Sequence, residues 1–304
     1  MTSRDYRKLA IEEFGAHLIQ SKDLDPVYVA LHNLHSCGHF DIRQLSRWLL
    51  SYLLCYHCGA ACWFSEQEGD QFFSALFTAA ENKLESPVGG RWPRSHERRH
   101  WRGEFATKVV AELAGRYEGQ PENFILTIAG VESFDAAKPQ PISFQEFSKR
   151  VQSHHGFGGW ATFKLADLID RLGLAPVNFA YEDVVIYKDP VEAAKRLFRE
   201  RYPVPEGAEV KDAAVKDVFN YLIKHFEDEA APPLYDRPIG LQEVETVLCK
   251  YKSHLNGRYP LYNDTIEIHE GLAPWLKNSK AAQLFSSAMP SQPTKDQEYT
   301  KSVA

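Results

Sequence analysis

Cysteine and methionine are scarce in this chain, which has five cysteines and two methionines among its 304 residues. A small, odd number of cysteines argues against a secreted domain held by disulfides and indicates a reducing cytosol. The first ten residues, MTSRDYRKLA, lack the apolar core of a signal peptide. We therefore expect a cytoplasmic protein.

A long apolar run and a positive net charge are also lacking. The longest apolar stretch is residues 48–64, WLLSYLLCYHCGAACWF, which is at the short limit for a membrane span and contains Ser51 and His57. We interpret it as a central core helix that is buried on all sides. The net charge of −6 excludes a generally basic protein, so a DNA site must be a local basic patch.

We find neither a strand-rich block nor an internal repeat, and apolar residues at helical spacing predict an all-α fold. The expected helices lie within residues 1–35 (two), 48–64, 66–86, 104–130 (two, broken at 119–121), 144–153, 190–201, 206–229 and 241–254. We expect one large helical domain over residues 1–278. The polar segment 279–304 is poor in core residues and predicts a disordered tail.

The rest of the chain is organised around residues 154–173, HHGFGGWATFKLADLIDRLG. Gly156 and Gly158 flank an apolar residue just before a periodic helix, and Gly173 supplies its stop. Unpaired backbone N–H groups at such a helix start suit a phosphate. The pattern matches the hairpin of a helix-hairpin-helix motif, which grips a DNA backbone, and it equally matches an ordinary helix–helix corner.

Residues 89–103, GGRWPRSHERRHWRG, are the most unusual stretch by composition. Arginine presents a planar fork of donors to phosphate oxygens, and tryptophan offers a stacking face for a base. A solvated helix start is the alternative, but such a surface mixes charges of both signs, so we favour phosphate binding. The candidate pyrophosphate- and DNA-binding residues here are Arg91, Trp92, Arg94, His96, Arg98, Arg99, His100, Trp101 and Arg102.

Histidines and cysteines are dense in residues 32–62 and raise the possibility of a zinc site. The residues concerned are His32, His35, Cys37, His39, Cys55, Cys58 and Cys62. No pair of Cys-x-x-Cys motifs is present, and cysteine is among the most buried residue types. We expect core thiols, no metal and no cofactor.

Together with the segment EDVVIYKDP at residues 182–190, the two stretches above resemble a phage family, the alpha-glutamyl/putrescinyl thymine pyrophosphorylases of clade 2 type. These proteins are also described as amino acid:DNA transferases. The resemblance covers roughly residues 25–270 and implies a fold related to the helix-hairpin-helix DNA glycosylases. It implies a phage enzyme in the host cytoplasm, with no membrane association, whose substrates are DNA and a small amine. The enzyme would replace the pyrophosphate of 5-pyrophosphoryloxymethyluracil by an amino acid or putrescine.

This chemistry requires a site for the leaving pyrophosphate, a grip on the strand, a flipped base and a general base for the amine. The arginines would meet the pyrophosphate, and the turn with its first helical residues would hold the strand. Histidine titrates near neutral pH, which suits a general base. The hairpin residues are Gly156, Gly158, Gly159 and Trp160, and the catalytic candidates are His154, His155, Lys164, Asp167 and Asp183.

Several alternatives remain open on the sequence. Lys164 and Asp167, three residues apart, equally suit a surface ion pair. Related glycosylases that use a covalent amine carry a lysine where Trp160 stands, and Asn178 falls near the position of their aspartate, so a glycosylase mechanism is doubtful. A glycosylase and a non-catalytic DNA-binding protein are the competing functions. A thiolate attack on the base would need an accessible cysteine, for which Cys37 is the best candidate.

Overall fold

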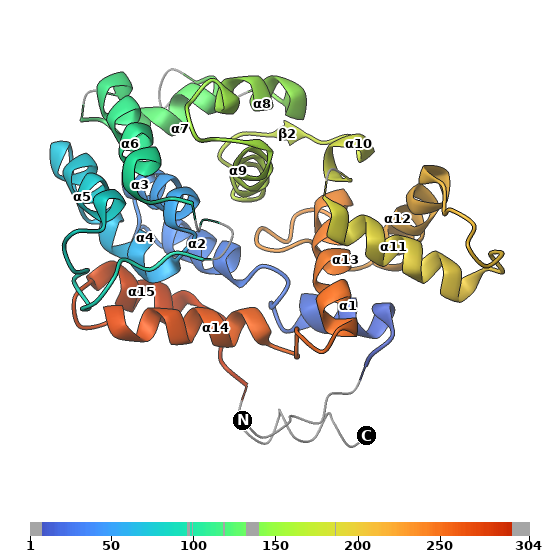
Figure 1. Cartoon of the computed structure of the whole chain (residues 1–304). Coiled ribbons are helices and arrows are strands. Elements are labelled where there is room, and N and C mark those ends of the chain that lie inside the picture. Colours follow the sequence, from blue (N-terminus) through green and yellow to red (C-terminus); the bar gives the residue numbers. More distant parts are fainter. Residues whose placement is uncertain are drawn as a thin grey trace. The chain divides into compact units, whose positions relative to one another are not determined.

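The computed structural model describes residues 8–95, 98, 100–117, 119–131, 140–185 and 187–293. They are mainly helical, with one two-stranded sheet, which confirms the predicted all-α class (Figure 1). The chain divides into two compact units, whereas we expected a single domain. Unit 1 comprises residues 1–26, 179–266 and 290–304, and unit 2 comprises residues 27–178 and 267–289.

In unit 1 the helices follow the predicted apolar spacing. They are α1 (Ile11–Gln20), α10 (Tyr181–Val184), α11 (Lys188–Arg201), α12 (Asp212–His225), α13 (Leu241–Leu255) and the start of α14 (Asn263–Leu272). Helix α13 packs on α1, α11 and α12. Gly15 of α1 is required by this packing, because a Cβ atom there would lie 2.4 Å from the ring of Phe226.

Unit 2 holds most of the predicted site residues. Its helices are α2 (Pro26–Ser36), α3 (Ile42–Cys55), α4 (Cys58–Ser65), α5 (Asp70–Glu81), α6 (Gly103–Tyr117), α7 (Glu122–Ala129), α8 (Phe144–Gln152), α9 (Gly159–Arg171), η2 (Ala273–Trp275) and α15 (Lys280–Ala288), with the end of α14. The break between α6 and α7 includes residues 119–121, as predicted. Among the described residues, no helix is long and apolar enough to cross a membrane.

The apolar stretch 48–64 forms two helices, so the prediction of one continuous helix is wrong. Tyr56 adopts a left-handed conformation, with φ of 50°, and ends α3. His57 then caps α4, because its Nδ1 accepts a hydrogen bond from the Ala60 N–H at 3.2 Å. Histidine is not among the residues that typically mark a helix start, so the sequence hides this break. Both helices are buried, as a core position requires.

The predicted disordered tail contains helix α15, so that prediction is wrong for residues 280–288. Phe285 is fully buried and stacks on Trp48 with ring centroids 5.3 Å apart. Ser279 caps the helix by accepting a hydrogen bond from the Ala282 N–H at 3.0 Å. One large aromatic and two buried alanines thus anchor a segment whose composition is otherwise polar.

A parallel two-stranded sheet closes the region of helices α8 and α9. Strand β1 (Ile142–Ser143) precedes α8 and pairs with β2 (Val177–Asn178), which follows α9 (Figure 1). Gly173, with φ of 69°, ends α9 as predicted, because the N–H of Leu174 bonds back to the Ile169 carbonyl at 3.0 Å. The sheet therefore joins the start of α8 to the end of α9, the two helices on either side of the predicted glycine turn.

Candidate functional site

The arginine-rich stretch 89–103, called the arginine segment below, has an exposed part and a part packed into unit 2. Arg91, His100 and Arg102 are exposed, while Arg94 and Arg98 are half-buried. His96 and Arg99 lie outside the described residues. Burial lowers the pKa of Arg98, and burial together with the neighbouring Arg102 and Arg91 lowers the pKa of Arg94. The segment therefore concentrates positive charge, as predicted.

The two tryptophans of the arginine segment are core residues. Trp92 is 5% exposed and stacks on Phe64 with ring centroids 5.1 Å apart and planes 15° from parallel. Trp101 is 2% exposed. Neither ring presents a face to a DNA base, so this structure does not support the predicted stacking role. The two buried tryptophans thus attach the charged segment to the core.

The arginine segment is attached to the carboxyl end of helix α3. The Ser95 N–H donates to the Cys55 carbonyl at 3.1 Å, and Arg98 Nε donates to the Leu54 carbonyl at 3.4 Å. The last carbonyls of a helix lack partners within that helix and carry its partial negative charge. They fix the position of Arg98 although the segment is far from α3 in sequence.

Arg98 also reaches the first turn of α9, the helix that follows the glycine turn. Its guanidinium carbon lies 5.6 Å from the centroid of the Trp160 ring. Tyr56, at the end of α3, meets the same indole edge-on at 4.8 Å. The arginine segment and the hairpin helix are separated by about sixty residues in sequence, and this contact brings them together.

The glycine turn before α9 packs against helix α6. Gly156 has φ of 84°, and a Cβ atom there would lie 2.5 Å from Val109, so both the backbone and the packing require glycine. Gly158 caps α9 in an extended conformation, and added Cβ atoms at Gly158 or Gly159 would meet no atom within 4 Å. The buried ring of Phe157 anchors the turn. The first N–H groups of α9 thus begin at an open glycine pair.

The two histidines of the turn differ sharply in environment. His154 is 2% exposed; its Nε2 lies 2.5 Å from the Tyr117 hydroxyl and its Nδ1 lies 3.1 Å from the carbonyls of Arg150 and Val151. Burial and the nearby Arg116 lower the pKa of His154. His155 is exposed. The structure thus gives His154 a packing role and leaves His155 as the exposed histidine of the turn.

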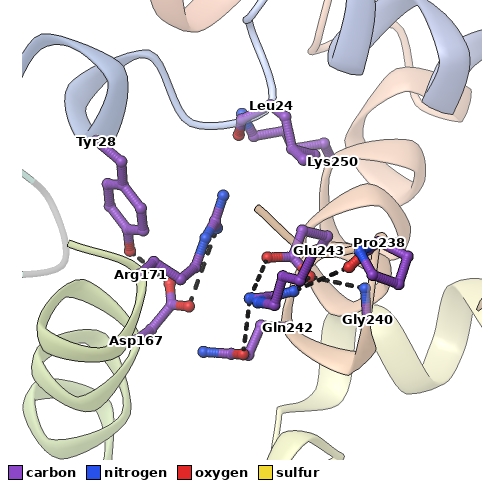
Figure 2. Close-up of polar contacts among 10 residues, drawn as sticks. Leu24, Tyr28, Asp167, Arg171, Pro238, Gly240, Gln242, Glu243 and Lys250 are labelled. Atoms are coloured by element: carbon purple, nitrogen blue, oxygen red, sulfur yellow. Dashed lines mark hydrogen bonds and ion pairs between the residues drawn. The ribbon is translucent and has the colours of Figure 1, made fainter. Parts of the chain in front are cut away.

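Helix α9 turns a row of polar residues toward Tyr28 of α2. The Tyr28 hydroxyl donates to Asp167 Oδ2 at 2.5 Å, and Arg171 Nη1 lies 3.9 Å from Asp167 Oδ1 (Figure 2). Lys164 Nζ and the Arg171 guanidinium carbon lie 4.8 and 4.7 Å from the centroid of the Tyr28 ring. Asp167 and Arg171 are each 2% exposed.

Asp167 is buried, so its setting is not that of a surface ion pair. The carboxylate is buried and shared between a phenol and a guanidinium, while the ammonium lies over an aromatic ring. Lys164, Asp167 and Arg171 form one row along the side of α9 that meets Tyr28. It supplies both signs of charge within unit 2.

Asp183 belongs to unit 1 and has a capping role there. Its Oδ2 accepts a hydrogen bond from the Ala180 N–H at 2.8 Å at the start of α10. A shallow hollow on α11, lined by Glu192, Lys195, Arg196, Arg199 and Glu200, contains none of the predicted site residues. We therefore place the candidate site in unit 2.

Three cysteines of the predicted dense region are core thiols, which confirms that interpretation. Cys55, Cys58 and Cys62 are buried, and Trp48 Nε1 lies 3.3 Å from Cys62 Sγ. Burial raises the pKa of Cys55 to about 12, although Arg98 and Arg94 act in the opposite direction. Cys55 is therefore a neutral thiol, and Cys37 is the exposed one.

Sequence reasoning missed Tyr28, Tyr56 and Ser95 in this site. Tyr28 and Tyr56 lie outside both predicted motifs. Ser95 lies inside the arginine segment, but serine is common in any position. The glycine spacing and the arginine density identified the two halves of the site, but the aromatic residues between them had no spacing signal.

The chain is similar to known phage proteins over most of its length. Residues 19–258 match the sequence profile of the family described as Amino acid:DNA transferase. A Pseudomonas phage PaMx11 protein named Glycinyltransferase is 46% identical over 300 residues, which are 95% of this chain and 98% of that protein. The Putrescinyltransferase of Delftia phage PhiW-14 is 26% identical over 273 residues, or 88% of this chain and 79% of that protein.

Proposed function

The chain belongs to the amino acid:DNA transferase family, and from this we propose that it replaces the pyrophosphate of 5-pyrophosphoryloxymethyluracil in DNA by an amine. It is a DNA-modifying transferase of the phage type. Its place of action is the cytoplasm of the infected host. Glycine is the first amine to test, because the relative with 46% identity is named for glycine.

The observation that carries this proposal is the contact between Arg98 and Trp160. It joins a cationic segment, suited to a leaving pyrophosphate, to the first turn of a helix, and a helix start suits a DNA phosphate. A binding module needs only the helix start. A reaction that expels pyrophosphate needs both, within reach of one flipped base.

The reaction conserves atoms and electrons without a redox partner. The bond between the methylene carbon and the pyrophosphate oxygen breaks, and its electron pair leaves with the pyrophosphate. The neutral amine nitrogen then forms a bond to that carbon. The proton lost by the nitrogen passes to a general base, for which the exposed His155 is the accessible candidate.

The buried pair of Asp167 and Arg171 has a positioning role in this scheme. Asp167 fixes the Tyr28 hydroxyl, and Lys164 lies over the same ring. The row leads from the Trp160 turn along α9, and its half-buried Lys164 would supply an ammonium for an amino acid carboxylate. We assign the amine side of the reaction to this row and the pyrophosphate side to the arginine segment.

The test uses the full chain, DNA carrying 5-pyrophosphoryloxymethyluracil, and either glycine, putrescine or no amine. We expect pyrophosphate release and one new nucleoside of increased mass with glycine, measured by mass spectrometry of the digested DNA. The rate should rise with pH through the range where histidine titrates, because the base must be neutral to accept a proton. His155→Gln should abolish this rise.

Two variants control the assay. Arg98→Ala should lose about 10²–10³-fold in rate if that guanidinium stabilises the leaving group. Arg43→Ala removes an exposed arginine of α3 and should leave the rate unchanged. Abasic sites and free base without a new nucleoside would show a glycosylase instead. Unchanged DNA with every amine would leave only DNA binding and refute the proposal.

A further inference from the structure

Four buried polar atoms of the arginine segment have no hydrogen-bond partner among the described residues. One is Nε1 of Trp92, whose ring stacks on Phe64 in the core. The other three are Ser95 Oγ, Arg98 Nη2 and Trp101 Nε1. Buried donors in proteins are nearly always paired, and each exception calls for a specific cause such as an absent ion or ligand. All three atoms can donate a hydrogen bond.

The backbone places these three side chains on the same side of the segment. The Arg98 N–H donates to the Ser95 carbonyl at 3.1 Å, and the Trp101 N–H donates to the Arg98 carbonyl at 2.9 Å. These are the three-residue steps of a 3₁₀ turn, in which side chains three residues apart lie above one another. The three donors therefore line one edge.

Within the part of the chain that the structure describes, no acid balances the charge of Arg98. Arg98 makes no ion pair with a carboxylate among the described residues, and Cys55, beside it, is a neutral thiol because burial raises its pKa to about 12. One side of the guanidinium is fixed by the Leu54 carbonyl, so the unpaired Nη2 cannot swing freely into solvent.

We propose that Ser95, Arg98 and Trp101 form an anion subsite that takes one phosphoryl group of the leaving pyrophosphate. The inference rests on the proposed function and assigns Ser95 and Trp101 a donor role in it. A phosphoryl group offers several acceptor oxygens on one centre, which three donors on one side of the segment can share. The donors are closed to solvent in this structure, so the anion binds as the segment shifts, and binding recovers the cost of leaving them unpaired.

The test measures binding of inorganic pyrophosphate to the full chain without DNA. In a spectrum of ¹⁵N-labelled tryptophan side chains, the Trp101 indole N–H should move as pyrophosphate is added, because it gains an acceptor. The Trp48 indole, already within hydrogen-bond distance of Cys62 Sγ, is the internal control and should not move.

Variants then test the contribution of each donor by calorimetry. Ser95→Ala and Trp101→Phe should each weaken pyrophosphate binding about tenfold, and Arg98→Lys should weaken it further, since lysine lacks the planar fork. Arg43→Ala, on the exposed side of α3, should bind as the unmodified chain does.

The two proposals fail in different ways. If the Trp101 signal stays fixed and Ser95→Ala and Trp101→Phe keep full affinity, the subsite is refuted, even if amine transfer to DNA proceeds. If Trp101 responds and both variants lose affinity, the subsite stands. In that case an unreacted modified base in the transfer assay counts against the proposed reaction alone.

Discussion

The buried polar cluster around Asp23 in unit 1 and the one around Arg98 in unit 2 differ in how their polar atoms are paired. Asp23 Oδ1 accepts hydrogen bonds from the N–H and the hydroxyl of Thr265, each at 2.8 Å, and Oδ2 accepts one from the Tyr259 hydroxyl at 3.2 Å. Lys250 pairs with Asp264 at 2.7 Å. Both signs of charge are present and each donor has an acceptor.

The cluster in unit 2 is only partly paired. Ser95, Arg98 and Trp101 each keep a buried donor without a partner among the described residues. A paired network stabilises a fold, whereas an unpaired donor costs free energy of folding. The difference is the one that the proposed anion subsite requires, with a structural network around Asp23 and donors kept for a ligand around Arg98.

The largest effect should come from opening the paired cluster. Lys250 Nζ also donates to the backbone carbonyls of Asp23 and Leu24, at 2.7 and 2.6 Å (Figure 2). Lys250→Ala leaves two acidic side chains and these carbonyls without their cation, and should lower the free energy of unfolding by about 3–5 kcal/mol. Urea denaturation measures this loss.

Lys188→Ala is the matched control for that variant. Lys188 is 82% exposed at its side chain and pairs with Glu192 at 3.2 Å on the surface of α11. Its removal should change the free energy of unfolding by less than about 1 kcal/mol. Equal losses in the two variants would show that the Asp23 cluster is no more important than a surface pair.

The paired cluster was beyond sequence reasoning, although the helices around it were not. Apolar spacing predicted α1, α11, α12 and α13 because each helix buries one stripe of its surface. The partners of Asp23 lie more than 220 residues away in the chain, and no local pattern marks a contact of that separation.

The candidate site in unit 2 was likewise predicted only in its separate parts, because contacts between distant residues leave no local pattern. Glycine spacing and arginine density are local signals, and they located the turn before α9 and the arginine segment. The burial of Trp101 and His154 was not predicted, because an aromatic ring near a charged residue suits a surface and a core equally. The contact of Arg98 with Trp160 was not predicted either, because Arg98 is held in place by the Leu54 carbonyl at the end of α3, which is distant in sequence.

A smaller effect should appear in the pH dependence of stability. Burial raises the pKa of Asp23 from 3.8 to about 6, with Lys250 acting in the opposite direction. The folded state therefore binds this proton more tightly than the unfolded state does. The resulting stability is fully present below 3.8 and is lost as the pH rises through about 6.

Asp23→Asn should remove this dependence, because asparagine keeps an acceptor for Thr265 and does not ionise. Between about pH 4 and pH 6, the unmodified chain should lose on the order of 2–3 kcal/mol relative to the variant. Thermal denaturation of both proteins across this range gives the difference. Parallel curves would mean that Asp23 titrates alike in the folded and unfolded chain.

The smallest effect, and the most direct test of the comparison, concerns one hydroxyl from each cluster. Ser95→Ala removes a buried hydroxyl without a partner, so in the absence of pyrophosphate it should change the free energy of unfolding by less than about 0.5 kcal/mol, or raise it slightly. Thr265→Val removes a hydroxyl bonded to Asp23 and should lower that free energy by about 1.5–3 kcal/mol. Urea denaturation of both variants, repeated with saturating pyrophosphate, measures the contrast. At equal concentration, pyrophosphate should stabilise the unmodified chain more than Ser95→Ala, because the stability that a ligand adds grows with the logarithm of its affinity for the folded state. If Ser95→Ala is as costly as Thr265→Val without pyrophosphate, Ser95 has a structural partner and the contrast between the clusters is wrong.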